Sequence, residues 1–325
     1  MTQQEPTDSS QVVRVARHLM ATRFEVLLYG ENPVSLRAVG EEVLDEIQSL
    51  EKRLSYYDPQ SVVSQINREA ARRPVRVDPI VFEVLLASER LWKLTEGAFD
   101  PTSAALTRCW GFAQSAGQLP GLRALAEAFD ATGMHQVELD SRSRTVRFHH
   151  PKTQIDLGSI GKGFALDQAA LIFAELGVEN VLIHGGSSSA VGLGTAPTGK
   201  PWRVAIDPPS EPEASGRWKP EETIDMEAVS GVVDLSATSL SVSAASGKGF
   251  TSEGEYYGHI LDPRSGEPTR GAELAAVVSP SAAETDALAT ALMVSGRDGA
   301  KRFLQCRPDI KGFILDAEGR FEFGD

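Results

Sequence analysis

Apolar residues recur at intervals of three and four along residues 36–54, a spacing that is typical of an amphipathic helix. A turn signal follows at Asp58-Pro59, so we expect this helix to stop near Ser55. A serine at 281 with a glutamate at 284 forms a capping-box pattern, which predicts the start of a helix that ends at Gly296. Further helices are predicted at residues 80–95 and 164–176, with a short helix or turn at residues 61–67.

Short runs rich in β-branched and aromatic residues predict strands between these helices. The longest run covers residues 12–29 and is interrupted near Met20-Ala21-Thr22. Two pairs of runs flank polar turns and predict hairpins, at residues 137–140 with 145–148 and at residues 313–315 with 321–323. Single strands are expected at residues 155–157, 181–184, 232–242, 259–261 and 275–278. Helices and strands mix without a regular βαβ rhythm, which predicts an α+β fold rather than a doubly wound parallel sheet.

The chain has 325 residues, of which 41 % are hydrophobic, so a sizeable core is available. We expect residues 1–11 to be a disordered tail and residues 12–325 to form a single domain. Residues 208–230 are polar with few apolar anchors, which predicts a surface excursion from that domain.

Charge and targeting signals narrow the possible partners. The net charge of −13 argues against nucleic acid, because a phosphate backbone needs a basic surface. No run approaches the ~20 apolar residues of a membrane span. The first residues have neither a signal peptide nor a lipobox, so the sequence as written predicts a cytoplasmic protein. If a native leader precedes this sequence, a periplasmic, membrane-anchored location is expected instead. Cys109 and Cys306 are expected to be free thiols.

Two stretches far apart in the chain suggest a divalent cation beside a phosphate. In residues 156–163, three glycines surround Lys162, so the backbone can approach an anion while the lysine supplies charge. In residues 286–290, Asp286 and Thr290 are four positions apart and share one helix face, as a hard-cation site requires. Together they indicate Mg²⁺-assisted chemistry on a phosphate ester.

These two stretches, and two further features of the sequence, also have purely structural interpretations. The glycine-rich stretch lacks the spacing of a P-loop or a dinucleotide fingerprint, and it could be a tight turn with a solvated lysine. Asp286 could serve the helix dipole, and Thr290 could bond back to a carbonyl. His259 could be a structural residue at the start of a strand or a proton acceptor. Gly185-Gly186 and the three serines after it could bind phosphate or form a turn.

The order of these pieces resembles the ApbE-type FAD:protein FMN transferases over nearly the whole chain, from about Met20 to Gly296. The resemblance rests on a series of motifs rather than on any single one. These are Met20-Ala21-Thr22, Leu54-Ser55-x-Tyr57, Gly97-Ala98-Phe99-Asp100-Pro101-Thr102, Asp156-Leu157-Gly158 to Lys162-Gly163 with Asp167, Ser246-Gly247, His259-Ile260-Leu261-Asp262-Pro263 and Asp286-Ala287-Leu288-Ala289-Thr290.

The resemblance implies an α+β arrangement related to the tunnel fold, in which two subdomains surround a flavin-binding cleft. It implies Mg²⁺ ligands at Asp286, Thr290 and Ser159, the last through its backbone carbonyl. Catalytic roles would fall to His259, Lys162 and Asp286. Contacts with FAD would come from Met20, Tyr57, Ala98, Phe99, Asp100, Asp156, Lys162 and Ile260, with Tyr57 and Phe99 against the isoalloxazine or the adenine.

The implied activity is Mg²⁺-dependent transfer of FMN from FAD to a threonine hydroxyl of a target protein, with release of AMP. The partners would be FAD and an acceptor protein with an exposed threonine in a flexible segment. Two alternatives stay open: an FAD pyrophosphatase that forms free FMN and AMP, and a non-catalytic FAD-binding protein. Ser187 stands where the family often has Asp or Asn, which gives the second alternative some weight.

Overall fold

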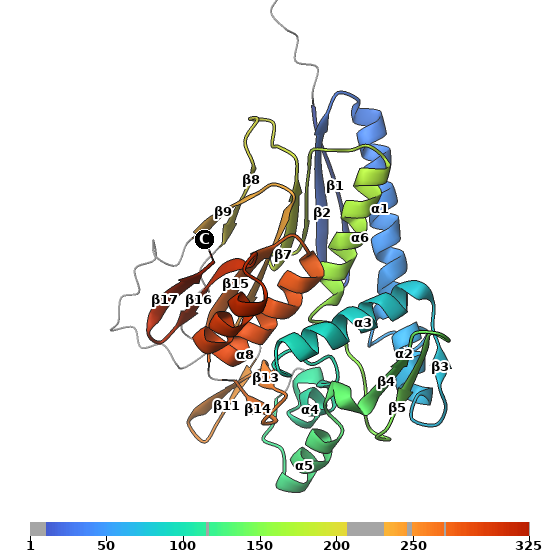
Figure 1. Cartoon of the computed structure of the whole chain (residues 1–325), viewed down its shortest axis with the longest axis vertical. Helices are drawn as coiled ribbons and strands as arrows, with labels where there is room; N and C mark the ends of the chain where they lie inside the picture. Colours follow the sequence, from blue (N-terminus) through green and yellow to red (C-terminus); the bar gives the residue numbers. More distant parts are fainter. Residues whose placement is uncertain (1–10, 115–116, 207–230, 246–248, 270, 325) are drawn as a thin grey trace, which may run out of the picture.

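The computed structural model describes residues 11–114, 117–206, 231–245, 249–269 and 271–324. Its centre is an eight-stranded sheet in the order β1-β2-β6-β7-β10-β15-β16-β17, in which every neighbouring pair is antiparallel (Figure 1). The strands are β1 (Gln11–Leu19), β2 (Thr22–Gly30), β6 (Val181–Gly185), β7 (Ser189–Leu193), β10 (Thr238–Ala244), β15 (Leu274–Ser279), β16 (Lys311–Asp316) and β17 (Gly319–Phe323). An antiparallel sheet combined with separate helices confirms the predicted α+β class.

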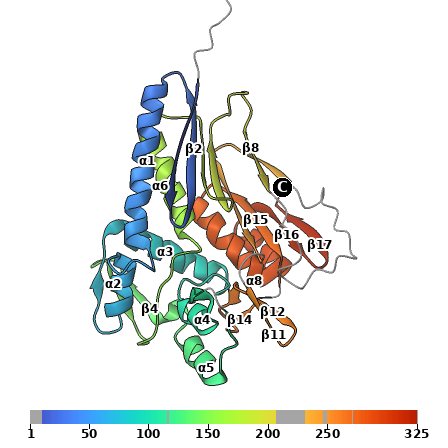
Figure 2. The ribbon, with the colours of Figure 1, turned by 180° about the vertical axis from the view of Figure 1, so that it is seen from behind.

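Three long helices cover one face of this sheet, which we call the inner face (Figures 1 and 2). They are α1 (Pro33–Leu54), α6 (Gly161–Glu175) and α8 (Ala282–Cys306). All seven apolar residues of the predicted stripe on α1 are buried, which confirms that helix and its orientation. The main hydrophobic core lies between these helices and the inner face, and Phe24, Leu44, Ile183 and Leu288 are completely buried in it.

The opposite, outer face of the sheet carries a smaller core under a two-stranded hairpin. This hairpin consists of β8 (Trp202–Ile206) and β9 (Gly231–Leu235). Trp202 and Ile206 pack toward the sheet, and the indole N–H of Trp202 donates to the Leu193 carbonyl of β7 at 2.8 Å. The side-chain alternation of the strands therefore separates two cores on the two faces of one sheet.

The remaining helices and strands gather below the large sheet in the view of Figure 1, and two of them, which contain Thr107 and Leu261, contribute to the lining of a cavity described below. The helices are α2 (Val62–Glu69), α3 (Pro79–Leu94), α4 (Ala104–Cys109) and α5 (Leu122–Asp130). The strands are β3 (Val75–Arg76), β4 (Val137–Asp140), β5 (Thr145–Phe148), β11 (Gly249–Ser252), β12 (Glu255–Gly258), β13 (Leu261–Asp262) and β14 (Glu267–Pro268).

The structure corrects several boundaries. Residues 155–157 are not a strand: the Asn67 side chain bonds both the N–H and the carbonyl of Ile155, and the Asp156 N–H donates to the Pro101 carbonyl. His259 lies in a connection and only β13 after it is a strand. The run 232–242 is divided between β9 and β10.

The helix ends also differ from the expectation. Helix α6 begins at Gly161 rather than at Phe164, so Lys162 stands in its first turn. Helix α8 does not stop at Gly296 but kinks there and resumes to Cys306, since Gly296 has the non-helical angles φ 58° and ψ −152°. Gln11 belongs to β1 rather than to the tail.

Further expectations concern the cysteines, membrane-spanning helices and the terminal and internal polar segments. Both cysteines are free, and no helix within the described ranges is long and apolar enough to cross a membrane. The predicted tail, apart from Gln11, and the predicted excursion at 208–230 lie outside the described residues.

Candidate functional site

The two stretches singled out in the sequence meet where α6 and α8 cross. The Lys162 ammonium lies 3.5 Å from Asp286 Oδ1, and the backbone N–H of Gly163 donates to Asp286 Oδ2 at 3.1 Å. The Asp286 side chain is only 7 % exposed and that of Lys162 is 22 % exposed. A buried carboxylate thus stands beside a lysine ammonium and a backbone N–H of the first turn of a helix, and both are favourable hydrogen-bonding or charge partners for it.

Glycine at 163 allows this close approach of the helices. A Cβ atom at that position would lie 2.0 Å from the carbonyl oxygen of Ala282 and 2.8 Å from Cα of Ala283. Both are backbone atoms of α8 that cannot swing away. Any larger residue would therefore push Asp286 away from Lys162.

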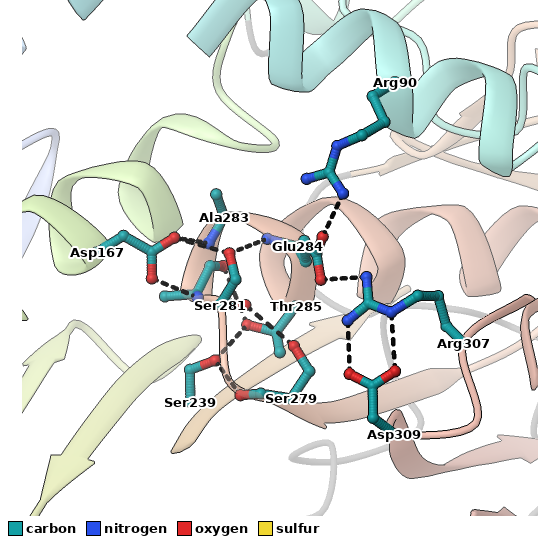
Figure 3. A network of polar contacts seen from close by, with 11 residues as sticks. Arg90, Asp167, Ser239, Ser279, Ser281, Ala283, Glu284, Thr285, Arg307 and Asp309 are labelled. Carbon is teal, nitrogen blue, oxygen red and sulfur yellow. Dashed lines mark hydrogen bonds and ion pairs between the residues drawn. The ribbon is translucent and has the colours of Figure 1, made fainter. Parts of the chain in front are cut away.

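Asp167, one turn further along α6, holds the N-terminus of α8 (Figure 3). Its carboxylate accepts from the Ser281 hydroxyl at 2.8 Å and from the backbone N–H groups of Ala282 and Ala283 at 2.7 and 3.0 Å. A carboxylate there satisfies orphan donors and complements the helix dipole. Burial raises the pKa of the Asp167 carboxyl, and these hydrogen bonds oppose that shift.

Glu284 anchors the first turn of α8 from its other side (Figure 3). Its carboxylate pairs with Arg90 of α3 at 2.7 Å and with Arg307 at 2.5 Å. The predicted capping box is therefore half correct: the Ser281 hydroxyl accepts from the Glu284 N–H, but the Glu284 side chain binds arginines instead of reaching back.

Asp286 and Thr290 lie on one face of α8, as the spacing predicts. The Thr290 hydroxyl also donates to the backbone carbonyl of Asp286 at 3.3 Å, the structural role considered from sequence, and lies 3.5 Å from the Ser243 hydroxyl. No group of three or more His, Cys, Asp or Glu side chains in the described part of the chain is placed to hold a metal. Any cation here would depend on one carboxylate, neutral oxygens and its substrate.

A cavity of about 330 Å³, which we call the central cavity, opens beside this pair. It contains most of the site residues predicted from the sequence. They are Ala98, Asp100, Ser159, Lys162, His259, Ile260, Asp286 and Thr290. Segments far apart in the chain thus converge on one hollow, and they include the two stretches at residues 156–163 and 286–290.

A second cavity of about 340 Å³, the tyrosine cavity, adjoins the central one and shares Gly158 and Lys162 with it. It contains the predicted residues Met20, Tyr57 and Asp156. The Tyr57 ring is 72 % exposed and packs edge-on against Tyr56, with ring centroids 5.2 Å apart. An exposed aromatic ring beside a hollow is a surface on which a flat ligand can stack.

The tyrosine cavity contains two residues with an unusual backbone conformation and one buried carboxyl group. Met20 and Ala21 both have positive φ angles, 49° and 59°, and the Met20 N–H donates to Glu51 of α1 at 2.7 Å. Non-glycine residues in this conformation are strained and are often found at functional sites. Burial raises the pKa of the Asp156 carboxyl, although the Gly158 N–H donates to it at 2.9 Å.

Two predicted contact residues have structural roles. The Phe99 ring is 1 % exposed within the main core, so the expectation that it contacts a flavin or adenine ring is wrong. Asp100 lines the central cavity, but its carboxylate also accepts from the N–H and hydroxyl of Thr102. Burial raises the pKa of Asp100.

Sequence reasoning missed other residues that line the two cavities. In the tyrosine cavity these include Glu51 and Tyr56, and in the central cavity Ser243. Ser188, which also lines the central cavity, is one of the three serines for which phosphate binding or a turn was considered. Tyr56 is the unspecified position of the Leu54-Ser55-x-Tyr57 motif and Glu51 lies three residues before that motif, so both could have been found from it. Ser243 could not, since only the pairing of β10 brings it opposite Thr290.

The fold places the chain in a class known from solved flavin transferases. The structural match to the apo flavinyl transferase ApbE of Pseudomonas stutzeri covers 98 % of this chain and 96 % of that one, with a TM-score of 0.80 and 25 % sequence identity. The ApbE protein of Thermotoga maritima gives a TM-score of 0.81 and 26 % identity over 96 % of this chain and 97 % of that one.

Residues 20–314 match the ApbE family, and the chain belongs to that family. A similar protein is the FAD:protein FMN transferase of Haemophilus influenzae, which is 29 % identical over 96 % of this chain and 91 % of its own length. The family resemblance seen in the sequence is thereby confirmed.

Proposed function

We propose that this chain transfers FMN from FAD to a threonine hydroxyl of another protein and releases AMP, with the help of Mg²⁺. The observation that carries the proposal is the convergence of Lys162, Asp286, Thr290 and His259 on the central cavity, next to a second hollow with an exposed tyrosine. This arrangement offers charge for a pyrophosphate, a proton acceptor and a surface for a ring system in adjoining spaces. The names of similar family members as FAD:protein FMN transferases support it.

The donor set suits Mg²⁺. Asp286 supplies one carboxylate, Thr290 a hydroxyl and Ser159 a carbonyl, and all three residues line the same cavity. Mg²⁺ prefers hard oxygen donors and commonly takes only one or two carboxylates together with substrate phosphates and water. When bound, the ion would offset negative charge on the pyrophosphate oxygens, which is the principal need of phosphoryl transfer.

The protein's own residues then define the steps. Lys162 places a positive charge beside the pyrophosphate. His259 accepts the proton of the threonine hydroxyl, and the threonine oxygen forms a new bond to the FMN phosphorus. The bond from that phosphorus to the bridging oxygen breaks, and the oxygen leaves with AMP. Proton acceptance of this kind typically contributes about 10²–10⁴-fold in rate.

The direct test is a time course of AMP release from FAD, combined with intact-mass analysis of a co-expressed flavoprotein subunit. We expect AMP and one FMN adduct on threonine, both abolished by EDTA and restored by Mg²⁺. AMP with free FMN in the absence of any acceptor would identify a pyrophosphatase. FAD binding without any AMP would identify a binding protein.

Asp286→Ala tests the metal site. We expect kcat to fall by at least about 10²-fold with a smaller change in the Kd of FAD, because the lost ligand acts mainly on charge that develops in the transition state. The matched control is Asp298→Ala on the same helix, whose side chain is 81 % exposed. Full activity of the Asp286 variant would remove the metal assignment.

A further inference from the structure

A third cavity near the site lies on the outer face of the sheet and has no role in the chemistry above. This outer cavity measures about 730 Å³ and lies between β8 and the outer-face side chains of β6, β7 and β10. Leu182, Ala190 and Leu240 form part of its floor. It is about twice the volume of either cavity already described.

The outer cavity meets the central cavity. Ser188, Val242, Ala244 and His259 line both. His259, the proposed proton acceptor, therefore faces a space reached from the outer side of the sheet as well as the space where the pyrophosphate would bind. A hydroxyl that approaches His259 from the outer cavity would arrive without crossing the tyrosine cavity.

One wall of the outer cavity is the free edge of β8. Trp202 and Ile206 are buried while Arg203 and Ala205 are exposed, so successive β8 side chains alternate as expected. Arg203, Val204, Ala205 and Ile206 nevertheless all line the cavity. Four consecutive residues can do so only if the cavity runs along the strand's edge. Within the described residues β8 pairs only with β9, so this edge can accept another strand.

We propose that the outer cavity is the groove for the acceptor protein, which binds as an extended segment along the edge of β8 and so brings its threonine to His259. The inference rests on the proposed transferase function and adds where and how the protein substrate binds. Addition of a strand to a sheet edge is a common way to recognise a flexible peptide. The charged or titratable side chains among the described lining residues are Arg203, His184 and His259, so the groove suits a neutral or acidic segment despite the chain's net charge of −13.

The first test is to fill the groove. Val204→Trp would occupy it, and the matched control is Val233→Trp, the register partner of Val204 on β9, which is similarly half-buried but does not line the cavity. The probe is a synthetic peptide spanning the threonine that the mass analysis above identifies. We expect the KM for this peptide to rise about tenfold in the Val204 variant alone, with the Kd of FAD unchanged, because only acceptor binding is lost.

The second test identifies the occupant. A photo-crosslinking residue is placed at Ala205, and at its register partner Val232, which is 55 % exposed, as the control. We expect an adduct with the peptide from position 205 only. Two results would overturn the proposed groove without affecting the proposed function. One is that position 205 forms adducts with another copy of this chain and none with the peptide. The other is that the Val204 variant still binds and cleaves FAD and has an unchanged KM for the peptide. Failure of the unmodified protein to release AMP from FAD would instead overturn the proposed function.

Discussion

Replacement of Gly163 by alanine tests whether the close contact of α6 and α8 builds the site. The new Cβ would lie 2.0 Å from the Ala282 carbonyl oxygen, although contacts under 3.0 Å are essentially never seen. The first turn of α8 must therefore move by about 1 Å, since the nearest atoms, in Ala282 and Ala283, belong to the backbone and not to a flexible side chain. Overpacking of this kind typically costs about 1–3 kcal/mol.

The same shift reaches the candidate site, because Asp286 lies in the first turns of α8 and accepts the Gly163 N–H. A misplacement of about 1 Å can lower the rate by about 10²-fold. We therefore expect both a lower free energy of unfolding, measured in urea, and a kcat for AMP release reduced by about that factor.

Gly161→Ala is the matched control for stability, because nothing lies within 4 Å of a Cβ built there. Alanine is the better helix former by roughly 1 kcal/mol, so this variant should be as stable as the parent or more so. If Gly163→Ala unfolds at the parent's urea midpoint and keeps the parent's kcat, the inferred clash does not shape the site.

Three further substitutions have defined outcomes. Asp167→Asn should lower the free energy of unfolding by about 1–2 kcal/mol, because an amide has only one oxygen to accept the three N–H and O–H donors at the start of α8; a urea midpoint equal to the parent's would contradict this. Trp110→Phe removes the indole donor to the Gly266 carbonyl but keeps a ring beside Tyr257. It should lower stability by about 1 kcal/mol and lower kcat more than FAD affinity, because the residues it fixes flank His259; a loss of FAD affinity alone would refute that role. Two hydrogen bonds of 2.7 Å from Arg297 lower the pKa of the Asp316 carboxyl, so the stability from this pair is present above the unfolded-state pKa of about 3.9 and is lost as pH falls through the folded value. Asp316→Asn should therefore destabilise the protein at pH 7 and progressively less toward pH 3, and a difference that is constant over this range would show that the ion pair is not its source.

The elements with strong periodicity could be predicted from the sequence. The apolar stripe of α1 is decisive because a helix packed on a sheet must bury one face, and its seven residues do so. The beginning of α6 could not be predicted, because Gly161 and Gly163 are poor helix formers. Contact with α8 holds that turn in helical form, and no local pattern reports such a contact.

The wrong strand at residues 155–157 has a similar cause. Its apolar pattern is that of a strand, but a side chain, Asn67, takes the place of a partner strand. Among the residues of the central cavity, Lys162, Asp286 and Thr290 were predicted from their own chemistry. Ala98, Asp100, Ser159 and Ile260 were predicted only from the family resemblance. The burial of Phe99 and the presence of the outer cavity could not be predicted, since both depend on packing between segments far apart in the chain.

The hydrogen bond between Gly163 and Asp286 joins positions 123 residues apart, and the hydrogen bond from Trp110 to Gly266 joins positions 156 residues apart. Contacts of such long range form late, because the intervening loop must close first. A chain still emerging from the ribosome, with α8 not yet made, therefore has no Asp286 to complete the pair with Lys162. The candidate site is therefore complete only when synthesis is nearly finished, because α8 ends at Cys306 of the 325 residues.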